Sequence, residues 1–247
     1  MKRWRRVIGI GALVVLAVLV GGLVWFAWPQ QVLPEAQEAL VPSPSVSVEQ
    51  SDGRLTFTPS SPINDTGFIL YPGGKVPPDG YAVPARAIAE QGYLVVVPSM
   101  PLNFAVFNAD AAAGVIADHP EIEAWAVGGH SLGGAMAGQF VANHPGTVEG
   151  LVLWAAYTAS DTSATGVEAV SIYGSLDSGA ERMTSTSSLA LLPTDTPVVE
   201  IDGGNHANFG SYVGQANDPP ATVPREQQQA QAVATTVSLL ESISVDE

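Results

Sequence analysis

The sequence between residues 123 and 137 reads Glu123-Ala124-Trp125-Ala126-Val127-Gly128-Gly129-His130-Ser131-Leu132-Gly133-Gly134-Ala135-Met136-Ala137. An apolar run comes first, then a serine between glycines, then a stretch of small residues. The apolar run is typical of a strand that is buried on both faces of a parallel sheet. The small residues would let a following helix lie close to that sheet. The stretch therefore predicts a strand, a sharp turn and a helix, with Ser131 at the turn.

Gly129-x-Ser131-x-Gly133 matches the nucleophile-elbow pattern, in which a strained turn lifts a serine hydroxyl above the sheet. The amide of Leu132 would then stand at a helix N-terminus, where it can stabilise an oxyanion. The pentapeptide is short, and the chain contains 25 glycines, so the motif has weight only in its context.

The rest of the chain alternates apolar strands with helical segments. Such alternation predicts a parallel sheet with helices on both faces, and its ligand sites lie at the carboxyl ends of the strands. A turn at Asp52-Gly53 also predicts a preceding β-hairpin between residues 45–48 and 55–58. We expect strands at residues 67–71, 93–98, 124–128, 150–155, 169–173 and 197–202, and helices at about 81–91, 104–118, 132–143 and 224–241.

A serine nucleophile needs a base, and the base needs an orienting carboxylate. His206 lies in a glycine-rich loop directly after the last expected strand, which favours it as the base over the other three histidines. His119 and His144 each precede a proline at a helix end and look like surface residues, and His130 should point to the other side of the turn from Ser131.

Asp177 follows the strand at residues 169–173 by a short turn, as an orienting carboxylate should. Asp202 also ends a strand and is the alternative, but it lies only four residues before His206 on the same loop. The resulting chain order of serine, acid and base is that of α/β-hydrolases.

A second oxyanion amide is expected from the loop Tyr71-Pro72-Gly73-Gly74-Lys75-Val76. Glycines there let backbone amides approach a substrate closely. The donor could be Gly73, Gly74 or Lys75.

Four motifs in this order resemble the α/β-hydrolase family, in particular a small, membrane-tethered bacterial group related to dienelactone hydrolase and simple carboxylesterases. They are residues 71–76, 129–134, 173–177 and 203–206, and the resemblance covers about residues 66–240. It implies an α/β-hydrolase fold with a mostly parallel sheet of about eight strands, and a Ser131–His206–Asp177 triad. Dienelactone hydrolase uses a cysteine nucleophile, and this chain has no cysteine, so that activity is not carried over.

The N-terminus differs from the rest of the chain. Lys2, Arg3, Arg5 and Arg6 precede an uncharged apolar run at residues 7–28, which at about 1.5 Å per residue is long enough for a bilayer core. We expect an uncleaved anchor at residues 1–28 with the remainder on the extracytoplasmic side. Cleavage as a signal peptide, followed by secretion, is the alternative.

Residues 29–44 contain four prolines and are expected to form an extended linker to a single domain at 45–247. Four of the nine basic residues lie before residue 7, so the remainder has five basic and 24 acidic residues, a net charge of −19. This charge argues against binding to nucleic acid.

These observations predict a serine hydrolase that cleaves carboxylic esters of small or exposed acyl groups and needs no metal or organic cofactor. Residues 156–168 are too few and too polar to build a large cap domain, so we expect an open site. The alternatives are a catalytically silent binding protein with the same fold, or an acyltransferase or amidase that uses the same triad.

Overall fold

An eight-stranded sheet lies at the centre of the protein, with the strand order β1-β2-β4-β3-β5-β6-β7-β8. The computed structural model describes residues 13, 15–22, 28–62, 65–214 and 217–244. β1 pairs with β2, and β2 with β4, in antiparallel fashion, whereas every later pair is parallel. The strands are β1 (Val46–Ser51), β2 (Arg54–Pro59), β3 (Thr66–Tyr71), β4 (Leu94–Pro98), β5 (Ala124–His130), β6 (Gly150–Trp154), β7 (Glu168–Gly174) and β8 (Val198–Ile201).

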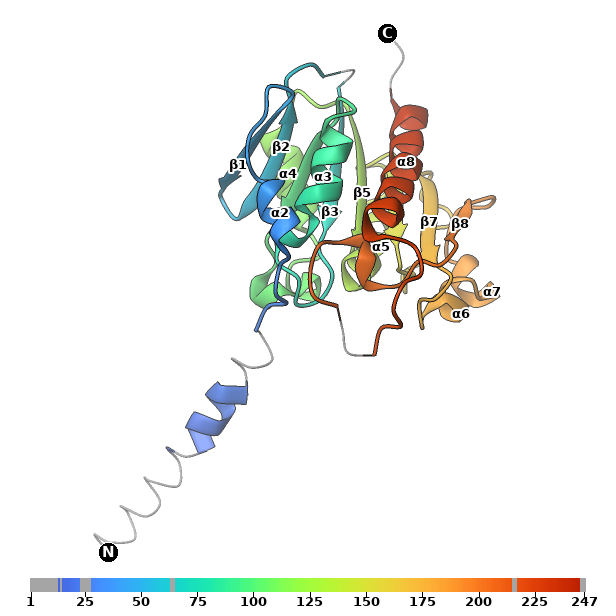
Figure 1. Ribbon diagram of the computed structural model, residues 1–247. Coiled ribbons are helices and arrows are strands. Elements are labelled where there is room, and N and C mark those ends of the chain that lie inside the picture. The colour runs from blue at the N-terminus through green and yellow to red at the C-terminus, as the bar shows by residue number, and fades with distance from the viewer. Residues whose placement is uncertain (1–12, 14, 23–27, 63–64, 215–216, 245–247) are drawn as a thin grey trace, which may run out of the picture.

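Helices cover both faces of this sheet (Figure 1). The side chains of α3 and α8 belong to the core on one face, and those of α4 and α5 to the core on the other. The α-helices are α2 (Pro34–Glu38), α3 (Ala82–Ala89), α4 (Ala111–Asp118), α5 (Leu132–Asn143), α6 (Ala180–Met183), α7 (Thr186–Leu189) and α8 (Arg225–Ile243). Short 3-10 helices are η1 (Pro78–Tyr81), η2 (Pro101–Asn103), η3 (Ala105–Phe107) and η4 (Ala207–Phe209). The mostly parallel, two-sided architecture confirms the predicted fold class.

The central strands are buried because their residues are apolar on both faces. Every residue of β3, β4, β5 and β6 is buried. The large Trp154 side chain at the end of β6 is fully buried and donates its Nε1–H to the Thr236 hydroxyl of α8, 3.1 Å away. This bond fixes the C-terminal helix against one face of the sheet. We call the end of the sheet at which β3 to β8 finish the carboxyl edge.

The predicted hairpin is present as β1 and β2. Asp52 and Gly53 form its turn with φ of 50° and 71°. Two consecutive positive φ values are what a tight turn between twisted strands requires.

One expected helix is shorter than predicted. Residues 104–118 were expected to be one helix, but α4 begins only at Ala111, and a 3-10 turn with an extended residue stands before it. The reason is a tertiary contact: the Tyr71 hydroxyl accepts the Ala112 amide and donates to the Ala109 carbonyl, which fixes a helix start at this point.

The proline-rich segment 29–44 is not the extended linker that we expected. It contains α2, whose Ala36 is completely buried against the body. Arg86 on α3 donates to the carbonyl oxygens of Ala39 and Val41, which secures the end of this segment. The amino-acid composition of the segment alone does not predict these side-chain contacts with the folded body.

The expected membrane anchor lies largely outside the described residues. In the described part of the chain, no helix combines the length and the apolar character needed to cross a membrane. Residues 15–22 are helical, and their leucine and valine side chains are exposed.

Candidate active site

Ser131 sits at a strained turn between β5 and α5. Its φ of 54° and ψ of −121° place it in a region that L-residues rarely adopt, at a cost of about 1–3 kcal/mol. A Cβ on Gly129 would lie 2.4 Å from the backbone of Gly133, and a Cβ on Gly133 would lie 2.2 Å from the Tyr71 carbonyl oxygen. The two glycines of the motif are therefore required by the close approach of strand, turn and helix.

Asp177 and His206 form a hydrogen-bonded pair at the same edge of the sheet. The His206 Nδ1 atom lies 2.7 Å from Asp177 Oδ2, and the Asp177 side chain is 1% exposed. The other carboxylate oxygen, Oδ1, accepts the Gly179 amide at 2.7 Å. Because a carboxylate can only accept, the bond holds the proton of a neutral His206 ring on Nδ1 and leaves Nε2 as the basic nitrogen.

The loops that carry the acid and the base are bound to each other. Leu176 donates its amide to the Gly204 carbonyl at 2.8 Å, and Gly203 donates to the Ser175 hydroxyl at 2.9 Å. A Cβ on Gly174 would be only 2.4 Å from the Gly204 backbone. Asp202, the alternative acid, is exposed, and the structure brings Asp177 and not Asp202 to the histidine.

Two further side chains hold the His206 loop, and sequence reasoning missed both. Asp218 accepts the amides of His206 and Ala207 at 3.1 and 2.7 Å. The fully buried Gln228 of α8 accepts the Asn205 amide and donates to the Asn205 carbonyl. Gln228 carried a weak signal, since it is a polar residue in a helix that covers the core, but no local pattern linked it to His206.

The loop after β3 offers one open backbone amide beside the elbow. The Gly73 amide donates to the Tyr81 hydroxyl at 2.9 Å, and the Lys75 amide donates to the Asn103 carbonyl at 2.7 Å. Within the described residues, the Gly74 amide has no such acceptor, and a Cβ on Gly74 would lie 3.6 Å from Leu132 Cδ2. Leu132 is the first residue of α5, so its amide has no partner within the helix. Of the three candidates in this loop, Gly74 is the one whose amide has no backbone acceptor among the described residues, so it is the candidate second donor.

His130 lies behind the site, as predicted, and is not a second base. It is 1% exposed, with Nδ1 2.8 Å from the Tyr81 hydroxyl and Nε2 3.0 Å from the His206 carbonyl oxygen. Burial is the main cause that holds the pKa of His130 well below its usual range, and the nearby His206 ring contributes. The ring therefore stays neutral. The contribution of Tyr81 could not be foreseen, because it lies 49 residues away in the sequence.

His119 and His144 lie away from this site. His119 pairs with Glu121 at 2.9 Å, and His144 with Asp110 at 3.0 Å, both with exposed carboxylates. This confirms that neither histidine is close to Ser131.

A cavity of about 300 Å³ connects the three candidate catalytic side chains. In the described part of the chain, the Ser131 hydroxyl makes no hydrogen bond, so it is open to this cavity. The Arg182 guanidinium stands over the Tyr157 ring, 4.3 Å from its centroid, at one wall. The lining residues are Ser131, Leu132, Ala135, Ala155, Ala156, Tyr157, Asp177, Gly179, Arg182, Met183 and His206.

The fold and this edge define the class of protein. The family model described as the alpha/beta hydrolase family matches residues 67–230, about two thirds of the chain. The chain belongs to the alpha/beta hydrolase family, and this membership supports hydrolase activity.

Two solved structures show a similar fold. One is a predicted CIB-like hydrolase from Thermoplasma acidophilum, with a TM-score of 0.57 and 15% identity over 78% of this chain and 99% of the other. The second is TT1662 from Thermus thermophilus, with a TM-score of 0.57 and 14% identity over 79% of this chain and 98% of the other. At such identities the likeness shows the fold alone. No curated protein sequence shows significant similarity to the chain.

Proposed function

We propose that this protein is a serine hydrolase that cleaves carboxylic esters through an acyl-enzyme. The observation that carries the proposal is the 2.7 Å bond between His206 Nδ1 and the buried Asp177 carboxylate, beside the same cavity as Ser131. Such a pair has little structural purpose at the open edge of a sheet, whereas a serine nucleophile requires it.

In this mechanism the Ser131 oxygen attacks the ester carbonyl and His206 Nε2 takes its proton. Ser131 and His206 line the same cavity, and catalytic hydrogen bonds of this kind commonly tighten only when substrate binds. Asp177 stabilises the charged imidazole that results. The proton then passes to the leaving alcohol, and the acyl group stays on Ser131.

The amides of Leu132 and Gly74 are the proposed donors to the tetrahedral oxyanion. Each such donor contributes about 3 kcal/mol to transition-state stabilisation in serine hydrolases.

In the second half of the reaction, His206 takes a proton from water, the hydroxide adds to the acyl carbonyl, and Ser131 leaves with the proton returned to its oxygen. The carboxylic acid is released.

The acyl group would occupy the cavity beside Ala135, Ala155 and Met183, which is apolar and of limited volume.

We further propose that residues 1–28 anchor the protein in a membrane, with the catalytic domain on the extracytoplasmic side. The support is the basic cluster and the apolar run of the sequence.

A fluorophosphonate probe tests the nucleophile directly in the full chain. The wild-type protein should be labelled and should hydrolyse p-nitrophenyl butyrate, and Ser131→Ala should lose both properties. Ser178→Ala is the matched control, since this serine is exposed one residue beyond Asp177 and should keep both. Labelling that survives in Ser131→Ala would contradict the proposal.

A further inference from the structure

The chain enters the folded body beside the candidate active site. Gln30 donates its amide to the Lys75 carbonyl at 2.7 Å, directly after Gly73 and Gly74. Val32 forms an antiparallel bridge with Tyr212, and the Val213 amide donates to the Gln31 carbonyl at 2.8 Å. The N-terminal segment is therefore fixed to both loops that flank Ser131, at the carboxyl edge of the sheet.

This attachment leaves little free chain between the body and the apolar run. The run at residues 7–28 ends at Trp28, two residues before Gln30. At about 3.5 Å per residue, these two residues span no more than about 7 Å. A membrane that holds this run must then lie close to Lys75 and Tyr212, and not at a distance set by a long tether.

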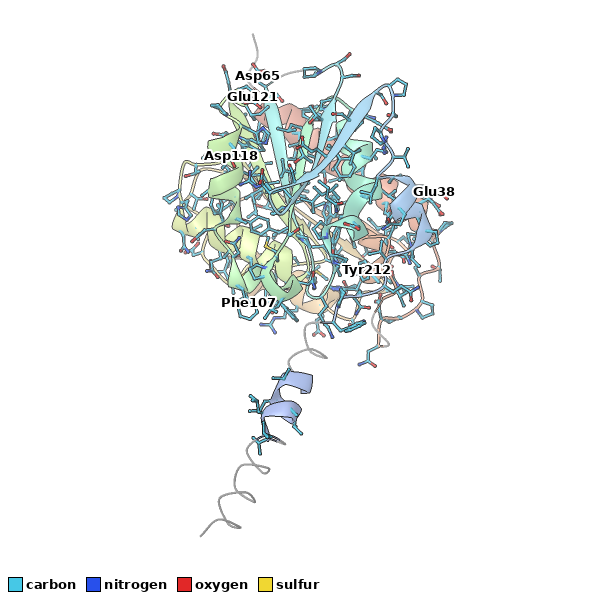
Figure 2. The ribbon with its side chains drawn as sticks, turned by 90° about the vertical axis from the view of Figure 1, so that its left-hand side faces the viewer. Glu38, Asp65, Phe107, Asp118, Glu121 and Tyr212 are labelled. Carbon is cyan, nitrogen blue, oxygen red and sulfur yellow. The ribbon has the colours of Figure 1, made fainter. Side chains whose placement is uncertain are left out.

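Exposed apolar side chains gather at this same edge. Leu102, Val106 and Phe107 of η2 and η3 are 44%, 52% and 56% exposed. Figure 2 shows Phe107 and Tyr212 at the end of the molecule from which the N-terminal chain emerges, with Asp65 and Glu121 at the opposite end. Val198 is the first residue of β8, at the opposite end of the parallel strands, and the Val41 carbonyl accepts from Arg86 of α3. The large apolar side chains that are exposed from Trp28 onward in the described residues are Trp28, Val41, Leu102, Val106, Phe107, Val198 and Val213.

The apolar patch of Leu102, Val106 and Phe107 adjoins the proposed oxyanion loop. The Phe104 ring packs edge-on against Phe107, with centroids 6.3 Å apart, and an added Cβ on Gly74 would lie 3.4 Å from the same Phe104 ring. A ligand that lies against the patch is thus within reach of the Ser131 cavity.

The net charge of −19 on the body excludes attraction to an anionic surface, so the contact that this patch favours is with neutral lipid.

We infer that the carboxyl edge faces the surface of a bilayer of neutral lipids, and that the natural esters are amphiphiles that lie in that surface. The substrate class rests on the proposed hydrolase function, whereas the orientation rests on the proposed membrane anchor at residues 1–28. Apolar side chains beside an anchored helix are a known means of adding membrane contact. The ester bond of such an amphiphile would reach Ser131 without leaving the lipid interface.

The absence of cysteine allows a direct test of orientation. Single variants Phe107→Cys, Val106→Cys, Glu121→Cys and Asp65→Cys of the full chain would be labelled with a fluorescent dye and placed in phosphatidylcholine vesicles that contain brominated phosphatidylcholine. We expect quenching at positions 106 and 107 and none at 121 and 65. Equal quenching at both ends, no quenching at 107, or failure of the full chain to bind the vesicles would overturn the inference. None of these results depends on catalysis.

The substrate class is tested with two esters of one fluorescent alcohol, 4-methylumbelliferyl octanoate held in phosphatidylcholine vesicles and 4-methylumbelliferyl acetate in water. The double variant Leu102→Ser/Val106→Ser should lose about tenfold in rate on the vesicle-held ester, because these side chains no longer gain from transfer into lipid. It should keep its rate on the acetate, and Val41→Ser should keep both. A loss on both esters, or on neither, would contradict the substrate class. Hydrolysis that persists in Ser131→Ala would instead count against the hydrolase mechanism alone.

Discussion

The Nε2 atom of His130 lies 3.0 Å from the carbonyl oxygen of His206, and this bond links β5 to the His206 loop. A carbonyl can only accept, so Nε2 carries the proton and Nδ1 accepts from the Tyr81 hydroxyl at 2.8 Å. The Tyr81 oxygen in turn accepts the Gly73 amide at 2.9 Å. One chain of three hydrogen bonds thus joins the loop after β3 to the His206 loop.

Removal of the Tyr81 hydroxyl should disturb both ends of this chain. In Tyr81→Phe, the Gly73 amide and His130 Nδ1 lose their partner, and each unsatisfied buried group costs about 1–3 kcal/mol. We expect kcat for p-nitrophenyl butyrate to fall about 10–100-fold, as small displacements of catalytic groups do, with little change in KM.

Tyr212→Phe is the matched control for this substitution. Its ring centroid lies 6.3 Å from those of both Tyr81 and His130, but its hydroxyl takes no part in the chain. It should keep nearly wild-type kcat. Equal effects of the two substitutions would show that the ring packing, and not the hydrogen-bonded chain, holds the site.

Burial of His130 makes the stability of the protein depend on pH. The folded state holds the pKa of His130 well below the value of 6.5 that it has when unfolded. Below pH 6.5 the unfolded chain therefore binds a proton that the folded protein does not, and stability is lost as the pH falls further. Above pH 6.5 this contribution is fully present.

The variant His130→Gln removes that dependence while it keeps a side chain that can donate and accept. Its free energy of unfolding in urea should be below that of the wild type at pH 7.5. The difference should shrink by up to about 1 kcal/mol between pH 6.5 and 5.5, because the unfolded histidine goes from half to about nine-tenths protonated over this interval. A difference that stays constant over this interval would mean that His130 binds its proton in the folded protein as it does in the unfolded chain.

Asp177→Asn tests the orienting role of the carboxylate. An amide at this position can no longer hold the Nδ1 proton and stabilise a charged His206, and loss of this function in serine hydrolases lowers kcat about 10⁴-fold. Asp202→Asn, at the exposed alternative acid, should change kcat by less than about twofold, because surface substitutions usually have small effects. Activity that depends on Asp202 instead would refute the Asp177 assignment.

The parts of the site that the sequence could predict depend on local structure and on strand ends. α5 spans the predicted residues 132–143, because the strained Ser131 turn and the adjacent glycines fix its start. Asp177 and His206 each follow a strand of a parallel sheet, so both had to emerge at one edge.

The parts that were missed depend on contacts between distant residues. Tyr81 of η1 reaches His130 from 49 residues away, and Asp218 and Gln228 hold the His206 loop from 12 and 23 residues away. No periodicity or turn signal marks such side chains. The position of α2 was hidden for a similar reason, since its few apolar residues gain stability only from the body that covers them.

The steric role of Gly133 gives a prediction about the elbow itself. A Cβ at this position would lie 2.2 Å from the Tyr71 carbonyl and 2.5 Å from the Pro72 carbonyl, which are backbone atoms that cannot rotate away. In Gly133→Ala, α5 must therefore shift from the loop after β3, and the Leu132 and Gly74 amides separate. We expect a loss of several kcal/mol in the free energy of unfolding, at or above the usual 1–3 kcal/mol for overpacking, together with loss of ester hydrolysis.

Gly114→Ala is the control, because Gly114 is an exposed position in α4 where a Cβ meets only the end of the Arg54 side chain at 3.1 Å. That substitution should leave the activity unchanged and raise stability by up to about 1 kcal/mol through helix propensity. Both variants are compared by urea unfolding and by p-nitrophenyl butyrate hydrolysis. A stable, active Gly133→Ala protein would contradict the prediction, because it would show that α5 can lie farther from the loop after β3 without loss of function.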